Sequence, residues 1–172
     1  MGCISSQLEG EEVPDDKKVK PKQNAQFIID NPGKIYENYD IDKKDKISSG
    51  STGYVCKAKQ KKSGHVRAVK TIPKAHVRDM ESLKREFKIT QMMDHPNISK
   101  HYESFEDHRN IYVVTELCQG GQLFDRIIDQ GYLSEIAVAH LMEQIIRAVD
   151  YIHKQGVFHR DIRPENVLFL NK

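Results

Sequence analysis

The stretch His159-Arg160-Asp161-Ile162-Arg163-Pro164-Glu165-Asn166 decides how the rest of this sequence is interpreted. Pro164 fixes its own φ, lacks an amide donor and keeps Arg163 out of the helical region, so the segment is not a regular helix. The apolar runs at 157–158 and 167–170 predict two short buried strands on either side. We therefore expect a carboxylate, a cation and a carboxamide on a rigid loop between strands. Such a set suits phosphoryl transfer, which needs a group to accept a hydroxyl proton and an oxygen ligand for magnesium.

The composition is that of a globular domain with a polar tail. The 172 residues correspond to about one domain, with 38% hydrophobic and 30% charged residues. The net charge is +2 and no basic stripe is interleaved with aromatic residues, which argues against a nucleic-acid-binding surface. Cys3, Cys56 and Cys118 are far apart. They fit a reducing intracellular compartment rather than a disulfide framework or a zinc site.

The N-terminus carries a possible lipidation signal. Met1-Gly2-Cys3-Ile4-Ser5-Ser6 matches the N-myristoylation pattern M-G-x-x-x-[ST], with Gly2 as the acceptor. Cys3 could carry a second, palmitoyl chain, which matters because a single myristoyl chain holds a membrane only marginally. The alternative is an ordinary, unmodified N-terminus. Residues 1–35 are mostly polar, contain three prolines and show no periodicity, so we expect a disordered tail.

A glycine-rich turn is expected between two strands within residues 47–57. The turn is Ser48-Ser49-Gly50-Ser51-Thr52-Gly53, and Tyr54-Val55 follow it. Glycines let phosphate oxygens approach main-chain N–H groups closely. A plain hairpin is the alternative interpretation.

The next predicted strand, 66–72, contains a lysine that needs a partner. Alternation places Ala68 and Lys70 on one face and Val69 on the other. The charge of a lysine on a half-buried strand must be neutralised by a neighbouring group.

The predicted helix at 79–93 could supply that neighbour. Its apolar residues recur at three- and four-residue spacing, and Pro96 lies just beyond its end. Glu86 lies at the edge of the apolar face, from which it can reach Lys70. Glu81 is the alternative, and a solvated position is the default for a helical glutamate.

The second half of the chain continues with two strands and two helices. Strands are expected at 101–105 and 111–117, and the latter leads into Thr115-Glu116-Leu117-Cys118-Gln119-Gly120-Gly121. A short helix is expected from Gln122. A longer helix should run from the N-cap residue Ser134 to about Lys154, with Gly156 just past its end.

In this order and spacing, the segments resemble the catalytic domain of a eukaryotic protein kinase over residues 36–172. The stretch at 159–166 resembles the catalytic loop H-R-D-L-x-x-x-N. The glycine-rich turn resembles G-x-G-x-x-G-x-V with Ser48 in place of the first glycine, and Ala68-Val69-Lys70 resembles the third-strand lysine motif. Pro164-Glu165-Asn166 favours the serine/threonine type, and the similarity is greatest to the calcium-dependent protein kinases of plants and protists. Those kinases often begin with Met-Gly-Cys as well.

The resemblance implies an α+β, protein-kinase-like fold. Residues 36–117 would form a small antiparallel sheet with one helix. Residues 118–172 would form the hinge and the first part of a helical lobe, ending just after the catalytic loop.

The resemblance also implies an activity and a set of site residues. The reaction would be transfer of the γ-phosphoryl group of ATP to a protein serine or threonine, with Mg²⁺. Asp161 would orient the hydroxyl and accept its proton, and Asn166 would bind a magnesium ion. Lys70, held by Glu86, would fix the α- and β-phosphates, and Arg163, where lysine is usual, would keep a cation near the γ-phosphate. The implied ATP-binding residues are Ile47, Ser48, Ser49, Gly50, Ser51, Thr52, Gly53, Val55, Ala68, Lys70, Thr115, Glu116, Cys118 and Gln122.

The sequence stops six residues after Asn166, before any Asp-Phe-Gly or Ala-Pro-Glu motif, and contains no EF-hand loop. We therefore expect a fragment of a membrane-tethered calcium-dependent kinase whose 172 residues alone are inactive. It would be intracellular and, if acylated, peripheral at the cytoplasmic face of a membrane. The alternative is a catalytically inactive module that binds nucleotide or a protein partner at the membrane.

Overall fold

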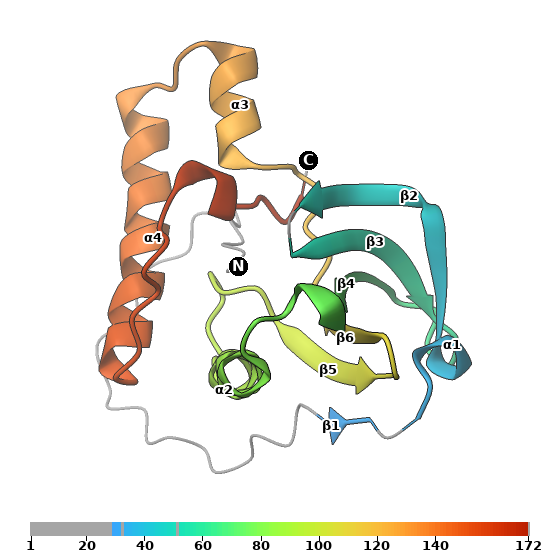
Figure 1. The fold of residues 1–172 in the computed structure, drawn as a ribbon. Helices are drawn as coiled ribbons and strands as arrows, with labels where there is room; N and C mark the ends of the chain where they lie inside the picture. The colour runs from blue at the N-terminus through green and yellow to red at the C-terminus, as the bar shows by residue number, and fades with distance from the viewer. Residues whose placement is uncertain (1–28, 32, 51, 172) are drawn as a thin grey trace.

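The structure, a computed structural model, describes residues 29–31, 33–50 and 52–171 (Figure 1). Gly2, Cys3 and most of the expected tail lie outside the described residues, and so does Ser51 of the glycine-rich turn. None of the helices in the described part has the length and apolar character needed to cross a bilayer.

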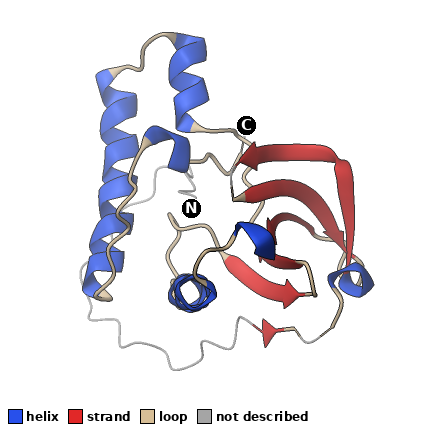
Figure 2. Cartoon of the chain, in the orientation of Figure 1, coloured by secondary structure: helices blue, strands red, loops and turns tan. Residues whose placement is uncertain are grey.

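The strands form one six-stranded sheet in the order β1-β5-β6-β4-β3-β2. Every neighbouring pair is antiparallel except β1 with β5. Figure 2 shows the strands in one half of the molecule and two neighbouring helices, Leu123–Gln130 and Glu135–Lys154, in the other. The strand bounds are β1 Ile29–Asp30, β2 Tyr39–Gly50, β3 Gly53–Gln60, β4 Val66–Pro73, β5 His101–Glu106 and β6 Asn110–Thr115.

The helices divide between the two halves, which confirms the expected α+β architecture. α1 and α2 accompany the sheet, whereas α3 and α4 stand side by side beyond it (Figure 1). The helix bounds are α1 Ile35–Asn38, η1 Lys74–His76, α2 Met80–Gln91, α3 Leu123–Gln130, α4 Glu135–Lys154 and η2 Pro164–Asn166.

Strand β6 shows how the sheet separates two cores. Ile111 and Val113 belong to a buried cluster against which side chains of α2 pack. Tyr112 and Val114 belong to a cluster on the other face. This alternation follows from the two-residue period of a strand. It confirms the predicted amphipathic helix at 79–93, because Met80, Leu83 and Phe87 provide the covering face.

The opposite face of the sheet is covered by a segment that the sequence analysis assigned largely to the tail. We call residues 29–31 and 33–39 the N-terminal clasp. Its strand β1 pairs with β5, and the Asn31 amide donates to the carbonyl of Ser104 at 3.0 Å. Ile35 is only 2% exposed. The expected end of the tail at residue 35 is therefore too late, since the folded domain already includes residues 29–31 and 33–35. The sequence did not reveal this because a single buried isoleucine produces no periodic pattern.

Two predicted strands are wrong. Residues 157–158 have no strand conformation, and Phe158 is 64% exposed. Within 167–170 only Leu168 forms a bridge, and it pairs with Gln122 alone. A strand needs a neighbour along its length, and an apolar run does not by itself reveal whether one exists.

The long helix is confirmed with its cap. Ser134 Oγ accepts from the Ala137 amide at 3.2 Å, which satisfies one N–H of the first turn. Ile145, Ala148 and Ile152 are buried on α4. Ile145 packs with Leu123, Val167 and Phe169 in the core of the second half.

Candidate active site

The loop at 159–166 is held in shape by its own polar groups. Asn166 Nδ2 donates to the carbonyl oxygen and to Oδ2 of Asp161, both at 2.8 Å. The Asp161 amide donates to His159 Nδ1 at 3.3 Å. Arg160 between them has φ +65°, a left-handed conformation that costs a non-glycine residue about 1 kcal/mol or more. The loop therefore holds Asp161 and Asn166 side by side in a defined orientation.

His159 contributes to this loop as a neutral acceptor. Burial lowers its pKa, and the charge of Asp161 opposes that shift only in part. A neutral imidazole keeps Nδ1 able to accept the Asp161 amide. The position of His159 is therefore structural, as its contacts are with the loop backbone.

Arg163 is paired within the same loop. Its Nε and Nη2 donate to the two carboxylate oxygens of Glu165, each at 3.2 Å. Both side chains are partly solvated, so the pair contributes at most about 1 kcal/mol. Its effect is to orient the planar guanidinium rather than to stabilise the fold.

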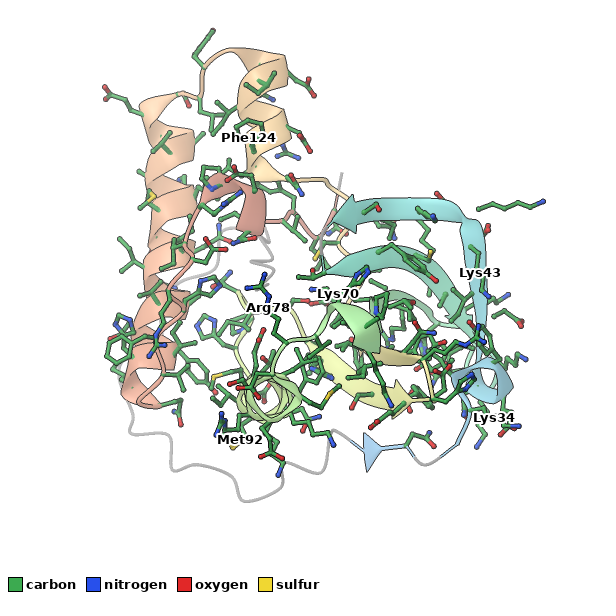
Figure 3. The ribbon with its side chains drawn as sticks, viewed as in Figure 1. Lys34, Lys43, Lys70, Arg78, Met92 and Phe124 are labelled. Atoms are coloured by element: carbon green, nitrogen blue, oxygen red, sulfur yellow. The ribbon has the colours of Figure 1, made fainter. Side chains whose placement is uncertain are left out.

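Lys70 lies on β4, within the strand that the sequence pattern predicts. Its register partners are Val55 on β3 and Val113 on β6, and it is half-buried. Burial lowers the pKa of Lys70, and the negative charge of Glu86 works in the opposite direction. Figure 3 shows Lys70 at the side of the sheet near the other half of the molecule.

Glu86 does not form the expected ion pair with Lys70. Glu86 is exposed on α2, and the ion pairs among the described residues do not include this one. The two groups are near enough to interact electrostatically across the space between β4 and α2. Solvent keeps the carboxylate hydrated, so nothing forces it inward onto a single cation.

A cavity of about 740 Å³ brings the expected catalytic residues together. Its walls come from β4, α2, α4 and the loop at 159–166. The members predicted from the sequence are Lys70, Glu86, Asp161, Arg163 and Asn166. Apolar side chains of α2 and α4, including Ile89 and Ile152, form much of the remaining wall. The cavity therefore combines an apolar floor with cations, carboxylates and a carboxamide.

The glycine-rich turn lies outside this cavity but is connected to Lys70 through the sheet. Ser48 pairs with Val55, which in turn pairs with Lys70. Gly53 has φ +133°, and a Cβ there would lie 2.0 Å from a backbone oxygen of β4, so the fold itself requires glycine. Gly50 has no atom within 4 Å of its hypothetical Cβ. Of the two glycines in this turn, Gly50 is therefore the one that leaves open space of the kind that a phosphate could approach. Ile47, Ser49 and Thr52 in the same hairpin are exposed.

The expected adenine-binding segment follows β6. Thr115 pairs with Ala68 on β4 and with His101 on β5. The Glu116 amide donates to the Lys100 carbonyl at 2.9 Å, whereas no backbone N–H of the described residues donates to the Glu116 carbonyl. That carbonyl is therefore available to a ligand that carries an N–H group. Cys118 is half-buried and follows two residues later.

Leu168 belongs to this region and was missed from the sequence. It is half-buried and forms an antiparallel bridge with Gln122, so it lies directly beside the adenine-binding segment. Its position two residues after Asn166 could have indicated that Leu168 lies near the site, since the chain that leaves the loop must pack beside another segment. Nothing in the local pattern identified that neighbour as residues 119–123.

The residues present fit Mg²⁺ and ATP. Asp161 provides carboxylate oxygens, and Asn166 provides an amide oxygen because its Nδ2 already donates to Asp161. Magnesium prefers such oxygen ligands and usually keeps several waters. In the described part of the chain, no group of three or more His, Cys, Asp or Glu side chains is placed to hold a metal. The Lys70 ammonium, the space at Gly50 and the Glu116 carbonyl suit phosphates and a base.

Comparisons with known proteins show the family to which the chain belongs. The family described as "Protein kinase domain" matches residues 41–172. Calcium-dependent protein kinase 5 of Plasmodium falciparum (isolate 3D7) is 43% identical over 146 residues, which cover 85% of this chain and 26% of that protein. CDPK-related kinase 7 of Arabidopsis thaliana is 43% identical over 143 residues, which cover 78% of this chain and 24% of that protein. The chain thus spans about a quarter of the length of these curated relatives. On this evidence the chain belongs to the protein kinase family.

Proposed function

We propose that this chain supplies the ATP-binding half and the catalytic loop of a protein serine/threonine kinase. The reaction of the whole protein is transfer of the γ-phosphoryl group of ATP to a serine or threonine hydroxyl. The observation that carries the proposal is that Lys70 lines the same cavity as Asp161 and Asn166, although it lies about 90 residues before them in the sequence. The kinase relatives support it, because their names describe the same class of enzyme.

Each residue has a role that follows from its surroundings. Asp161 orients the substrate hydroxyl and accepts its proton, with the carboxylate kept in place by Asn166 Nδ2. Asn166 would hold Mg²⁺ through its amide oxygen, and a bound magnesium ion neutralises charge on the phosphates. Lys70 in its protonated form binds the α- and β-phosphates. These phosphates supply the negative charge for the Lys70 ammonium, with which Glu86 forms no ion pair in this structure.

Nucleotide binding tests the first step of the proposal. Isothermal titration of the chain with Mg-ATP measures the dissociation constant. Lys70→Met should raise this constant at least about tenfold, because a charge-assisted contact is lost. Lys88→Met on α2 is a matched control, because Lys88 is exposed and does not line the cavity. Equal affinities for the Lys70 variant and the wild type would contradict the proposed phosphate contact.

Phosphoryl transfer tests the second step. The protein that carries this sequence, isolated from its source, should transfer labelled phosphate from ATP to a serine- or threonine-containing protein. Asp161→Asn should reduce the rate by about 10²–10⁴-fold with a smaller change in ATP affinity, because the variant loses the proton acceptor but keeps Lys70 and Asn166. A rate that is unchanged in Asp161→Asn would remove Asp161 from the mechanism.

A nucleotide- or partner-binding module without transfer activity is the second candidate. The exposed Glu86, unpaired with Lys70, favours it, since kinases need that ion pair for activity. The two candidates differ in one result. ATP binding that depends on Lys70, together with no detectable transfer by the isolated protein, would support the binding module.

Membrane attachment and calcium control complete the proposal. Acylation of Gly2, reinforced at Cys3, would place the protein at the cytoplasmic face of a membrane. Gly2→Ala should then move the protein to the soluble fraction, and Cys3→Ser should weaken attachment without abolishing it. Calcium control is proposed because the relatives are named calcium-dependent. Kinase activity that is equal in calcium and in a calcium chelator would exclude it.

A further inference from the structure

We propose that Gly120 is a positioning residue that sets the spacing between the adenine-binding segment and the catalytic loop. The inference rests on the proposed nucleotide-binding function and identifies how its two halves are held in register. The structural basis is a backbone ladder between residues 119–123 and residues 167–171, which we call the hinge ladder.

The hinge ladder consists of four backbone hydrogen bonds. All four are 2.9–3.0 Å long, and they connect residues far apart in the sequence. The bonds run from the Gln119 amide to the Leu170 carbonyl, from Gly120 to Phe169, from Phe169 to Gly121 and from Leu123 to Val167. Val167 directly follows Asn166, so the ladder begins one residue away from the proposed magnesium ligand.

Gly120 allows the two segments to approach this closely. A Cβ at residue 120 would lie 2.0 Å from the Asn171 carbonyl oxygen and 2.5 Å from the Phe169 Cβ. Both distances are far below van der Waals contact, and the Asn171 atom belongs to the backbone, which cannot rotate away. Any larger residue at position 120 must therefore increase the distance between the hinge and residues 169–171.

Residues 167–169 of the hinge ladder cannot move without disturbing the core. Phe169 is 9% exposed and belongs to the same buried cluster as Leu123, Ile145 and Val167. The Arg126 guanidinium lies 3.7 Å from the centre of the Phe169 ring, in a cation–π arrangement. Because these contacts anchor residues 167–169, a Cβ at residue 120 would be accommodated by a shift of the hinge relative to the loop.

The affinity for ATP should be sensitive to such a shift. Its base would contact the hinge, and its phosphates would lie near Lys70, Asp161 and Asn166. The connected ligand gains affinity over its separate parts only if both halves of the site are at the correct spacing. Separate adenosine and tripolyphosphate each occupy one half and are indifferent to the spacing.

The experiment compares three ligands on matched variants. Titrations with Mg-ATP, adenosine and Mg-tripolyphosphate are made on the wild-type chain, on Gly120→Ala and on Gly131→Ala. Gly131 is the control, because its φ of +73° makes alanine strained there, yet no atom lies within 4 Å of the added Cβ. Gly120→Ala should weaken Mg-ATP at least about tenfold and each separate part less than about threefold, since a misplacement of about 1 Å costs large factors only for the connected ligand. Gly131→Ala should leave the ratios among the three ligands unchanged.

Each outcome decides the question. The positioning role is overturned if a folded Gly120→Ala variant binds Mg-ATP, relative to adenosine and Mg-tripolyphosphate, as well as the wild type does. It is also overturned if the variant binds all three ligands more weakly by the same factor, in step with its loss of thermal stability. If Gly120→Ala does not fold, Phe169→Leu loosens the same ladder while it keeps an apolar side chain, and it should show the selective loss of Mg-ATP in weaker form. A wild-type chain that binds Mg-ATP no better than its parts refutes the proposed nucleotide site itself, and with it the role of Gly120.

Discussion

Replacement of Ile35 by alanine tests whether the N-terminal clasp is part of the folded domain. Ile35 is 2% exposed and packs in a buried cluster with Tyr39, Val69 and Phe105, among others. It covers the face of the sheet opposite to α2. If the clasp were part of a polar tail, the side chain at position 35 would have no effect on stability.

The expected cost follows from this burial. Isoleucine has three more carbons than alanine, and their transfer back to water costs about 2.4 kcal/mol. The cavity left behind adds to this cost and brings the total to about 3–5 kcal/mol, because the strands around it relax only partly. For a domain of this size, a loss of about 3 kcal/mol lowers Tm by about 6–12 °C.

Urea unfolding followed by circular dichroism measures this loss, with Val66→Ala as the control. Val66 is also a branched side chain on the sheet but is 47% exposed, so its replacement should change the free energy of unfolding by less than about 1 kcal/mol. Amide hydrogen exchange gives a second readout, since the Asn31 amide that donates to Ser104 should lose protection in Ile35→Ala. Equal midpoints for the two variants would refute the docked clasp.

Three further outcomes are expected. Burial lowers the pKa of Lys70 below its unfolded value of about 10.4, so the folded state binds fewer protons and stability rises with pH across that window. Lys70→Met should therefore raise the unfolding free energy at pH 7, and urea melts should show that the gain shrinks as the pH approaches about 10. Gly53→Ala should destabilise the domain because its Cβ would lie 2.0 Å from a β4 backbone oxygen, whereas Gly50→Ala should unfold like the wild type and yet bind Mg-ATP more weakly. Ser134→Ala should cost about 0.5–2 kcal/mol in thermal melts by removing the cap of α4, and Ser134→Asp should restore most of it.

The predictions that succeeded depended on local physics. Alternation placed Lys70 on the correct face of β4, and Ser134 identified the start of α4, because side-chain direction and capping depend on near neighbours. The apolar runs beside the loop were misjudged at 157–158 and 167–170, since a short apolar run fits several structures and its hydrogen-bonding partner is remote.

The sequence by itself therefore determined the central strands β3 to β6, the helices α2 and α4, the non-helical character of the loop at 159–166 and the family. Only the tertiary structure decided that Lys70, Asp161 and Asn166 line one cavity and that Glu86 remains in solvent. It alone decided as well that Gly120 touches residues 169–171 and that Ile35 closes a core. The physical reason is range: loops and caps depend on a few bonds, whereas cavities and close backbone contacts depend on how whole strands and helices pack.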